Sequence, residues 1–150
     1  VKPLLTKIPK LLGIDGRKMS KSYDNSISLG DTEDAIKKKC SAMFTDPERI
    51  KLSDKGRPEK CNVYAYYDLF KKEYAPEVYE YCTKAKAGCT ECKKNVGGVI
   101  SDYLADIRHK REGLLKDEDK INSILEKGAA EARKVAVETM AEVKRAIGLI

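Results

Sequence analysis

From residue 31 onward, apolar residues recur at the three- and four-residue spacing that is typical of amphipathic helices. The first predicted helix spans residues 32–45, because Asp31 can cap its start and Asp34 stands at its third position. The pair Asp46-Pro47 stops it. Its predicted inward face consists of Ile36, Cys40, Met43 and Phe44.

Two shorter helices are predicted beyond an aperiodic loop over residues 46–60. The second predicted helix carries apolar residues at positions i, i+3, i+4 and i+7, namely Val63, Tyr66, Tyr67 and Phe70. The third begins at Pro76 and is broken at Lys86–Gly88. Its inward face is predicted to hold Val78, Tyr81 and Cys82.

Two longer helices complete the pattern. The fourth is expected to begin with Thr90 as its cap and to end near the basic run Arg108–Arg111 and Gly113. Its apolar stripe consists of Val96, Val99, Ile100, Tyr103, Leu104 and Ile107. The last lies between Asp117 and Ile147 and keeps helical spacing for about eight turns. Its apolar face consists of Ile121, Ile124, Leu125, Ala129, Ala132, Val135, Ala136, Met140, Val143 and Ile147.

Residues 1–30 differ from the rest of the chain, because Pro and Gly punctuate them and no helical run is long enough to fold alone. No convincing strand alternation follows them. The predicted fold class is therefore mainly α, a helical bundle preceded by a non-helical segment. We expect residues 1–30 to be the trailing edge of a larger domain and residues 31–150 to form the helical domain.

Composition indicates a soluble globular protein. Hydrophobic residues make up 41% and charged residues 36% of the 150 positions, with 10 Gly and 5 Pro, which excludes disordered, collagen-like and membrane-spanning classes. The formal net charge of +6 favours an anionic partner such as nucleic acid or nucleotide. The sequence carries no signal for secretion or membrane insertion, so a reducing, cytoplasmic setting is the expectation.

The first candidate site is the loop Gly16–Ser22. Lys18 and Lys21 stand three residues apart, with the Ser20 hydroxyl between them. Lysines suit a polyphosphate, hydroxyl and backbone N–H groups add donors, and a loop without hydrophobic anchoring can engage a leaving group as its charge develops. A basic surface loop is the alternative.

The second candidate site is formed by cysteines. The chain has 5 Cys, an odd number, and Cys82, Cys89 and Cys92 lie close together, which suits a metal site better than a disulfide framework. With Cys61 they can hold structural zinc or an iron–sulfur cluster. Cys92 is expected in the first turn of a helix, where amide dipoles favour a thiolate. Cys40 fits the apolar core instead.

A third feature is a set of basic residues near the cysteines and farther along the chain, for which a solvated face is the alternative. The set consists of Lys84, Lys86, Lys93, Lys94, Arg108, Lys110 and Arg111. Five tyrosines can in principle stack on unpaired bases, although their helical spacing predicts most of them as core. They are Tyr64, Tyr66, Tyr67, Tyr79 and Tyr81.

The letters K-M-S-K-S at Lys18–Ser22 resemble the second signature of class I aminoacyl-tRNA synthetases. The surrounding letters LLGIDGRKMSKSYDN, with TDP at Thr45–Pro47 and CNVY at Cys61–Tyr64, are similar to the tryptophanyl-tRNA synthetase family in particular. The resemblance implies that Lys18 and Lys21 grip the phosphates of ATP, which is bound with Mg2+. It also implies tryptophan as substrate and tRNA(Trp) as the partner of the basic residues. The implied ATP-binding residues are Lys18, Met19, Ser20, Lys21 and Ser22.

The chain also departs from the family pattern. The family's first signature requires two histidines, whereas this chain has only His109, and no Gly-rich nucleotide-binding turn is present. The resemblance therefore implies the C-terminal part of a longer ligase, inactive alone, whose N-terminal half supplies the rest of the ATP and tryptophan sites. A homodimer is expected for the complete enzyme.

The cysteines resemble those of a subset of the family that carries a [4Fe-4S] cluster in the anticodon-binding domain, with the spacing C-x22-C-x6-C-x2-C. Here the first gap is x20, and a surface loop after Phe70 can absorb the difference. The resemblance favours a [4Fe-4S] cluster, with zinc as the alternative. The implied ligands are Cys61, Cys82, Cys89 and Cys92.

Three other functions stay open. The chain can be a stand-alone RNA-binding module that lacks ligase chemistry, or an iron–sulfur redox or sensor domain. A tyrosine-tRNA ligase is the third alternative, because the amino-acid pocket lies outside these residues.

Overall fold

The computed structural model describes residues 3–4 and 11–150, in two compact units, Val1–Arg108 and His109–Ile150. Across this part of the chain the only strand-like pairing is an isolated bridge between Leu12 and Lys18, so the mainly α fold class is confirmed. Two short 3-10 helices lie in the loops, η1 (Lys21–Tyr23) and η2 (Pro58–Lys60). The α-helices are α1 (Glu33–Ser41), α2 (Asn62–Phe70), α3 (Ala75–Thr83), α4 (Cys89–Tyr103), α5 (Ala105–Leu115) and α6 (Glu118–Ala146).

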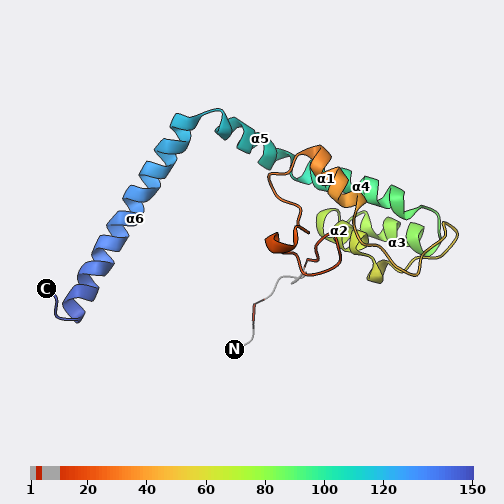
Figure 1. Cartoon of the computed structure of the whole chain (residues 1–150), viewed down its shortest axis with the longest axis horizontal. Helices are drawn as coiled ribbons and strands as arrows, with labels where there is room; N and C mark the ends of the chain where they lie inside the picture. The colour runs from red at the N-terminus through yellow and green to blue at the C-terminus, as the bar shows by residue number, and fades with distance from the viewer. Residues whose placement is uncertain (1–2, 5–10) are drawn as a thin grey trace. The chain divides into compact units, whose positions relative to one another are not determined.

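One apolar core holds the first unit together. α1 lies alongside α4, and α2 packs against both α3 and α4 (Figure 1). Ile36 and Cys40 of α1 and Ile100 of α4 are almost completely buried, because they occupy the apolar stripes of facing helices. The core assignment of Cys40 is therefore confirmed. The remaining core residues are Met43, Val63, Tyr66, Tyr67, Val78, Val96 and Leu104.

The ends of α1 differ from the prediction. Thr32, not Asp31, caps the helix, because its hydroxyl accepts a hydrogen bond from a backbone N–H of the first turn at 3.2 Å. Asp31 instead forms an ion pair with Lys39, whose Nζ lies 2.7 Å from Asp31 Oδ2. The helix ends at Ser41, so Phe44 leaves the inward stripe and is 41% exposed.

α2 and α3 follow the predicted pattern more closely. Pro76 stands in the first turn of α3, where its missing N–H costs no helical hydrogen bond. Val78 is buried as predicted, whereas Tyr81 and Cys82 are half-buried at the edge of the core.

α4 begins one residue before its predicted cap. Gly88 is the N-cap in an extended conformation, and Thr90 lies inside the first turn. The helix ends at Tyr103, and the basic run Arg108–Arg111 lies inside α5 rather than at a helix end. Ile107 lies beyond the break between α4 and α5, which interrupts the helical period, and it is 41% exposed. Tyr103, the last residue of α4, is 62% exposed, and its ring makes an edge contact with that of Phe70 at 5.1 Å.

In the second unit, α6 is the long helix predicted between Asp117 and Ile147. The Asp117 side chain caps it and accepts a hydrogen bond from the backbone N–H of Lys120 at 2.9 Å. No residue of α6 is buried, so its predicted apolar face is exposed. None of the helices that the structure describes has both the length and the apolarity needed to cross a membrane.

Replacing Ile100 by alanine should lower the free energy of unfolding by about 2–5 kcal/mol, because a large-to-small change leaves a cavity in the core. Ile107→Ala is the matched control, and at an exposed position it should cost well under half of that loss. Chemical denaturation followed by circular dichroism measures both variants. Equal losses would contradict this assignment of the core.

Candidate functional site

The first candidate site is the segment of residues 13–25, called the lysine loop below. The Gly13 N–H donates to the Arg17 carbonyl at 2.7 Å, and the Ile14 N–H donates to the Asn25 carbonyl at 2.8 Å. The Ile14 carbonyl accepts from the Phe44 N–H at 2.7 Å. These bonds join Ile14, at the start of the lysine loop, both to Asn25 at the end of the loop and to Phe44 in the segment that follows α1.

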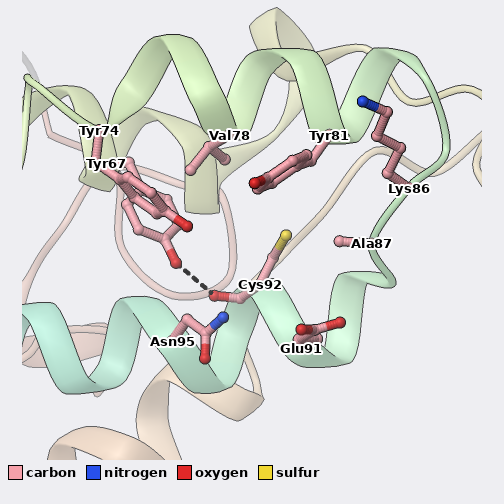
Figure 2. A pocket seen from close by; sticks show the side chains of 9 residues that line it. All are labelled: Tyr67, Tyr74, Val78, Tyr81, Lys86, Ala87, Glu91, Cys92 and Asn95. Carbon is pink, nitrogen blue, oxygen red and sulfur yellow. Dashed lines mark hydrogen bonds between the residues drawn. The ribbon is translucent and has the colours of Figure 1, made fainter.

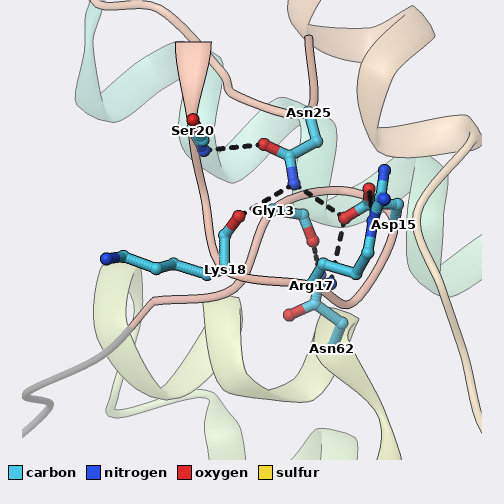
Figure 3. A network of polar contacts seen from close by, with 7 residues as sticks. All are labelled: Gly13, Asp15, Arg17, Lys18, Ser20, Asn25 and Asn62. Carbon is cyan, nitrogen blue, oxygen red and sulfur yellow. Dashed lines mark hydrogen bonds and ion pairs between the residues drawn. The ribbon is translucent and has the colours of Figure 1, made fainter. Parts of the chain in front are cut away.

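Asn25 joins the two sides of the lysine loop (Figure 3). Its side chain is nearly inaccessible to solvent and donates from Nδ2 to Asp15 Oδ1 at 2.8 Å and to the Lys18 carbonyl at 3.1 Å. Its Oδ1 accepts from the Ser20 N–H at 2.8 Å. Both N–H donors and the oxygen of this one amide are therefore engaged by the K-M-S-K-S segment and its base. Sequence reasoning did not assign this role to Asn25, although it is the last letter of the string LLGIDGRKMSKSYDN, because letters alone do not show that its side chain turns back onto the loop.

Gly13 permits this arrangement, because a Cβ there would lie 2.4 Å from Asn25 Cγ. The Gly13 carbonyl accepts from Asn62 Nδ2 at 2.8 Å, and the Leu12 carbonyl accepts from the Tyr66 hydroxyl at 2.7 Å. The lysine loop is thus attached directly to α2.

The lysine loop also has apolar anchors. Met19 and Ile14 are partly buried and pack against the core of the first unit. The expectation of a loop without hydrophobic anchoring is therefore wrong, because Met19 packs inward while Lys18 and Lys21 on either side of it are exposed.

Lys18 and Lys21 are both exposed, and neither takes part in an ion pair among the described residues. The nearby carboxylate of Asp15 is engaged by Arg17, whose Nε lies 2.7 Å from Asp15 Oδ2. The Arg17 backbone N–H, and then the Asn25 side chain, hold the pKa of Asp15 at about 2. The two lysines therefore present positive charge that no acidic side chain of the loop neutralises.

The second candidate site is a cavity that all four predicted cysteine ligands line, called the cysteine cavity below. Cys61 precedes α2, Cys82 lies on α3, and Cys89 and Cys92 lie in the first turn of α4. Val78 of α3 lines the cavity as well. The fold therefore brings together four cysteines that span 31 positions of the sequence, from Cys61 to Cys92.

Arg49 also lines the cysteine cavity. Its Nη1 lies 3.8 Å from Cys82 Sγ and 3.9 Å from Cys89 Sγ. Its Nη2 donates to the Ala87 carbonyl at 2.7 Å and to the Leu52 carbonyl at 3.3 Å. Sequence reasoning missed Arg49, because it lies in an aperiodic loop where a basic residue carries no distinguishing signal.

Burial controls the ionisation of the thiols. It raises the pKa of Cys92 to about 11 and raises the pKa of Cys61 and Cys82 as well. The Arg49 guanidinium acts in the opposite direction on Cys82 but does not outweigh burial. The expectation that the helix dipole favours a Cys92 thiolate is therefore wrong for the metal-free chain, in which desolvation is the larger effect.

Four sulfur donors around one cavity fit a metal group that binds through thiolates, since a bound cation removes the proton from a coordinating thiol. In the described part of the chain, no group of three or more His, Cys, Asp or Glu residues is arranged to hold a metal ion. The donor chemistry therefore fits such a group, while the positions of the sulfur atoms are not those of a single ion's coordination sphere.

The loop at residues 46–57 supports the cysteine cavity. Asp46 is buried and pairs with Arg57, with Arg57 Nη2 2.6 Å from Asp46 Oδ1 and Nε 3.1 Å from Oδ2. The Gly56 N–H donates to the Cys82 carbonyl at 3.0 Å. A Cβ at Gly56 would lie 2.4 Å from Cys82 Sγ, so only glycine allows this close approach.

The predicted basic set is divided between the two units. Lys84 and Lys86 share Glu80, with each Nζ 3.0 Å from Oε1, and they hold the pKa of that carboxyl below its usual range. Arg108 Nη2 donates to Ser101 Oγ at 3.0 Å, which turns part of this guanidinium away from solvent. Lys93 and Lys94 lie on α4, and Lys110 and Arg111 lie on α5 in the second unit.

Among the five tyrosines, the structure separates core from surface. Tyr66 and Tyr67 are buried core residues, as their spacing predicts. Tyr79 is 47% exposed, and its ring makes an edge contact with that of Tyr64 at 5.9 Å. Tyr81 is half-buried and lines a cleft between α3 and α4.

Residues 1–105 match the sequence model of the family described as tRNA synthetases class I (W and Y). A tryptophan--tRNA ligase of Aquifex aeolicus is 40% identical over 150 residues, which is 99% of this chain and 38% of that protein. One from Thermotoga maritima is 40% identical over 149 residues, which is 98% of this chain and 45% of that protein. The chain thus spans less than half the length of these curated relatives.

Solved structures give the same likeness. The tryptophanyl-tRNA synthetase from Campylobacter jejuni, complexed with ADP and tryptophan, superposes with a TM-score of 0.83 at 32% identity. The match covers 93% of this chain and 43% of that one. The enzyme from Aeropyrum pernix matches with a TM-score of 0.60 at 29% identity over 69% of this chain and 30% of that one.

Replacing Asp46 by asparagine should destabilise the chain in a pH-dependent way. Hydrogen bonds from Arg57 hold the pKa of Asp46 at about 2 in the folded chain, below its ordinary value of 3.8. The stabilisation is therefore complete above a pH of about 4 and is lost as the pH falls toward about 2. Chemical denaturation of the unchanged chain and of the Asp46→Asn variant across this range measures both free energies of unfolding. The difference between them should shrink as the pH falls. Asp102→Asn, at an exposed carboxylate, is the control and should show no such trend.

Proposed function

Because the chain belongs to the class I tRNA synthetases for tryptophan and tyrosine, we propose that it is the C-terminal part of a tryptophan-tRNA ligase. The complete ligase would join tryptophan to AMP at the expense of ATP, release pyrophosphate, and transfer the tryptophanyl group to tRNA(Trp). The names of the relatives support tryptophan over tyrosine, the other amino acid of the family. The proposal includes a homodimer of the complete ligase. It also includes a domain boundary after residue 30, between the trailing edge of the catalytic domain and the helical domain.

One observation carries the proposal most directly. Lys18 and Lys21 are exposed cations without acidic partners, on a loop that Asn25 and Met19 hold in place. Donors that are positioned before the reaction stabilise developing charge without reorganising, and the loss of one costs about 3 kcal/mol in the transition state. The lysine loop is therefore suited to the negative charge that builds on departing pyrophosphate.

The family resemblance supplies the proposed roles within the loop, and the geometry of the loop supports them. Lys18 and Lys21 would neutralise the phosphates. The Ser20 and Ser22 hydroxyls are hydrogen-bonded to each other at 2.8 Å, so one of them would donate to a phosphate oxygen while it accepts from the other. The backbone around Met19 would hold these donors in register, because the side chain is packed against the core. Mg2+ would enter with ATP and be held mainly by its phosphates.

The cysteine cavity is proposed to hold a [4Fe-4S] cluster through Cys61, Cys82, Cys89 and Cys92, with zinc as the alternative. Such a group would supply a covalent link between the start of α2, the end of α3 and the start of α4. Arg49 would balance part of the negative charge of the thiolates, since its guanidinium already contacts two of the sulfurs.

The helical part is proposed to bind the anticodon region of tRNA. Lys84, Lys86, Lys93 and Lys94 surround the end of α3 and the start of α4, and Arg108, Lys110 and Arg111 follow along α5. Phosphate contacts from such residues dominate affinity for nucleic acid and make it dependent on salt.

The double change Lys18→Ala with Lys21→Ala in the complete ligase should lower the rate of ATP–pyrophosphate exchange by at least about a hundredfold, because two positioned donors are lost. The matched control is Lys38→Ala with Lys51→Ala, which removes the same charge at exposed positions away from the loop. Normal exchange at saturating ATP would contradict the assigned role.

The metal proposal is tested by measuring iron, zinc and acid-labile sulfide in chain purified without oxygen. A cluster should give about four iron and four sulfide per chain, and Cys89→Ala should abolish both. Cys40→Ala should retain them, because Cys40 lies in the core and does not line the cavity. One zinc per chain without sulfide would show that the site holds zinc instead of a cluster. The absence of both iron and zinc would refute the site.

A further inference from the structure

α2 contacts both candidate sites. Cys61 is its N-cap, and Val63 and Tyr64 line the cysteine cavity together with Cys61. Farther along the helix, the Tyr67 hydroxyl donates to the Cys92 carbonyl at 3.3 Å, as Figure 2 shows. One side of α2 is therefore attached to the residues around the four thiols.

Another side of α2 holds the lysine loop. Asn62 and Tyr66 stand four residues apart, which places them on the same face of the helix. Asn62 Nδ2 donates to the Gly13 carbonyl at 2.8 Å (Figure 3), and the Tyr66 hydroxyl donates to the Leu12 carbonyl at 2.7 Å. Since a helix of 9 residues is rigid over its length, a shift of α2 at the cysteine cavity also moves the groups that hold the loop.

The two carbonyls that α2 holds belong to residues that pair with the K-M-S-K-S segment or with the residue before it. Leu12 and Lys18 form an isolated bridge, and the Gly13 N–H donates to the Arg17 carbonyl at 2.7 Å. Arg17 directly precedes Lys18. The position of α2 therefore sets the position of the backbone that carries the first lysine of the loop.

Packing alone does not explain an asparagine at position 62. The Asn62 side chain is buried, and its Oδ1 has no hydrogen-bond partner among the described residues. A buried acceptor without a partner costs stability. Its Nδ2, in contrast, is used on the Gly13 carbonyl at the base of the lysine loop. The residue is therefore explained by what it holds in place.

A second connection joins the same two sites. Thr45 lines the cysteine cavity, and the N–H of the preceding residue, Phe44, donates to the Ile14 carbonyl at 2.7 Å. The Ile14 N–H in turn donates to the Asn25 carbonyl at 2.8 Å, and the Asn25 side chain accepts from the Ser20 N–H. The lysine loop is thus attached on two sides to segments that line the cysteine cavity.

Building on the functions proposed for both sites, we propose that α2 couples the cysteine cavity to the lysine loop, with Asn62 as a positioning residue. When the four cysteines share one bound group, the start of α2 is fixed against α3 and α4, and Asn62 fixes the Gly13 carbonyl. Without that group the start of α2 is less restrained, so the loop is less ordered and stabilises the charge on departing pyrophosphate less well. Coupling between two sites is reciprocal, so phosphates on the loop also favour retention of the group.

Hydrogen–deuterium exchange of the full chain, purified without oxygen, tests the coupling without requiring activity. Peptides that cover residues 13–25 report on the bonded N–H groups of Gly13, Ile14 and Ser20. Cys89→Ala removes one proposed metal ligand without changing α2, and it should speed exchange of this segment at least about fivefold, a factor within the range for one lost hydrogen bond. Residues 97–104 of α4 should not speed up comparably.

Asn62→Leu tests the positioning residue, because it keeps the size of the side chain and removes the donor to Gly13. It should speed exchange of residues 13–25 about fivefold while the metal content stays that of the unchanged chain. Adding Cys89→Ala should then have about a twofold further effect at most, since the connection is already broken.

Ser101→Ala is the matched control, because it removes one hydrogen bond of a buried side chain away from both sites. It should leave exchange of residues 13–25 unchanged and keep the full effect of Cys89→Ala. Thermal melts check that each variant is folded.

In the complete ligase, Asn62→Leu should lower kcat for ATP–pyrophosphate exchange at least about fivefold, because the donors are no longer held in place before the reaction. KM for tryptophan should change little, whereas a purely structural role would reduce only the amount of folded enzyme. The coupling is measured by hydrogen exchange and the function of the lysines by pyrophosphate exchange, so the two can fail separately.

Four results would overturn the proposal. Unchanged exchange of residues 13–25 in Cys89→Ala that has lost its metal would refute the coupling and leave the metal site in place. Equal acceleration of residues 13–25 and 97–104 would show general destabilisation instead. A full effect of Cys89→Ala in the Asn62→Leu background would refute the role of Asn62. The absence of both iron and zinc from the unchanged chain would refute the metal site and the coupling with it.

Discussion

Burial of one face of α4 is the interaction on which the first unit depends. Val96, Ile100 and Leu104 lie on that face at intervals of four residues and are 0–4% exposed. α4 contacts both α1 and α2 along this face. The same helix begins with Cys89 and carries Cys92 in its first turn. Because a helix of 15 residues is rigid over its length, packing at one end positions the chemistry at the other.

Buried polar side chains hold the segments that are not helical. A loop has no hydrogen-bond ladder of its own, so its backbone groups need other partners. Asn25 supplies them to the lysine loop, Asn62 attaches that loop to α2, and Asp46 closes the loop that carries Arg49. Each candidate site therefore combines an exposed or reactive group with a buried amide or carboxylate that fixes it.

The candidate sites differ in how they treat charge. Lys18 and Lys21 are exposed and unneutralised, which suits a transient anion. The thiols of Cys61, Cys82 and Cys92 are partly buried, and desolvation raises the pKa of each, which suits a cation that takes the place of the protons. The lysine loop and the cysteine cavity therefore offer two chemically distinct sites, one suited to an anion and the other to a cation.

The sequence by itself determined the helices, the K-M-S-K-S loop and the cysteine spacing. Those features are local, because helical period and motif letters depend on residues a few positions apart. Only the tertiary structure decided which side chains complete the sites. Arg49 meets sulfurs 33 and 40 positions away, and Asn62 reaches a carbonyl 49 positions away. It also decided that Phe44 is partly exposed and that the apolar face of α6 is not buried. Such pairings depend on how the chain closes in space, and no local period encodes that closure.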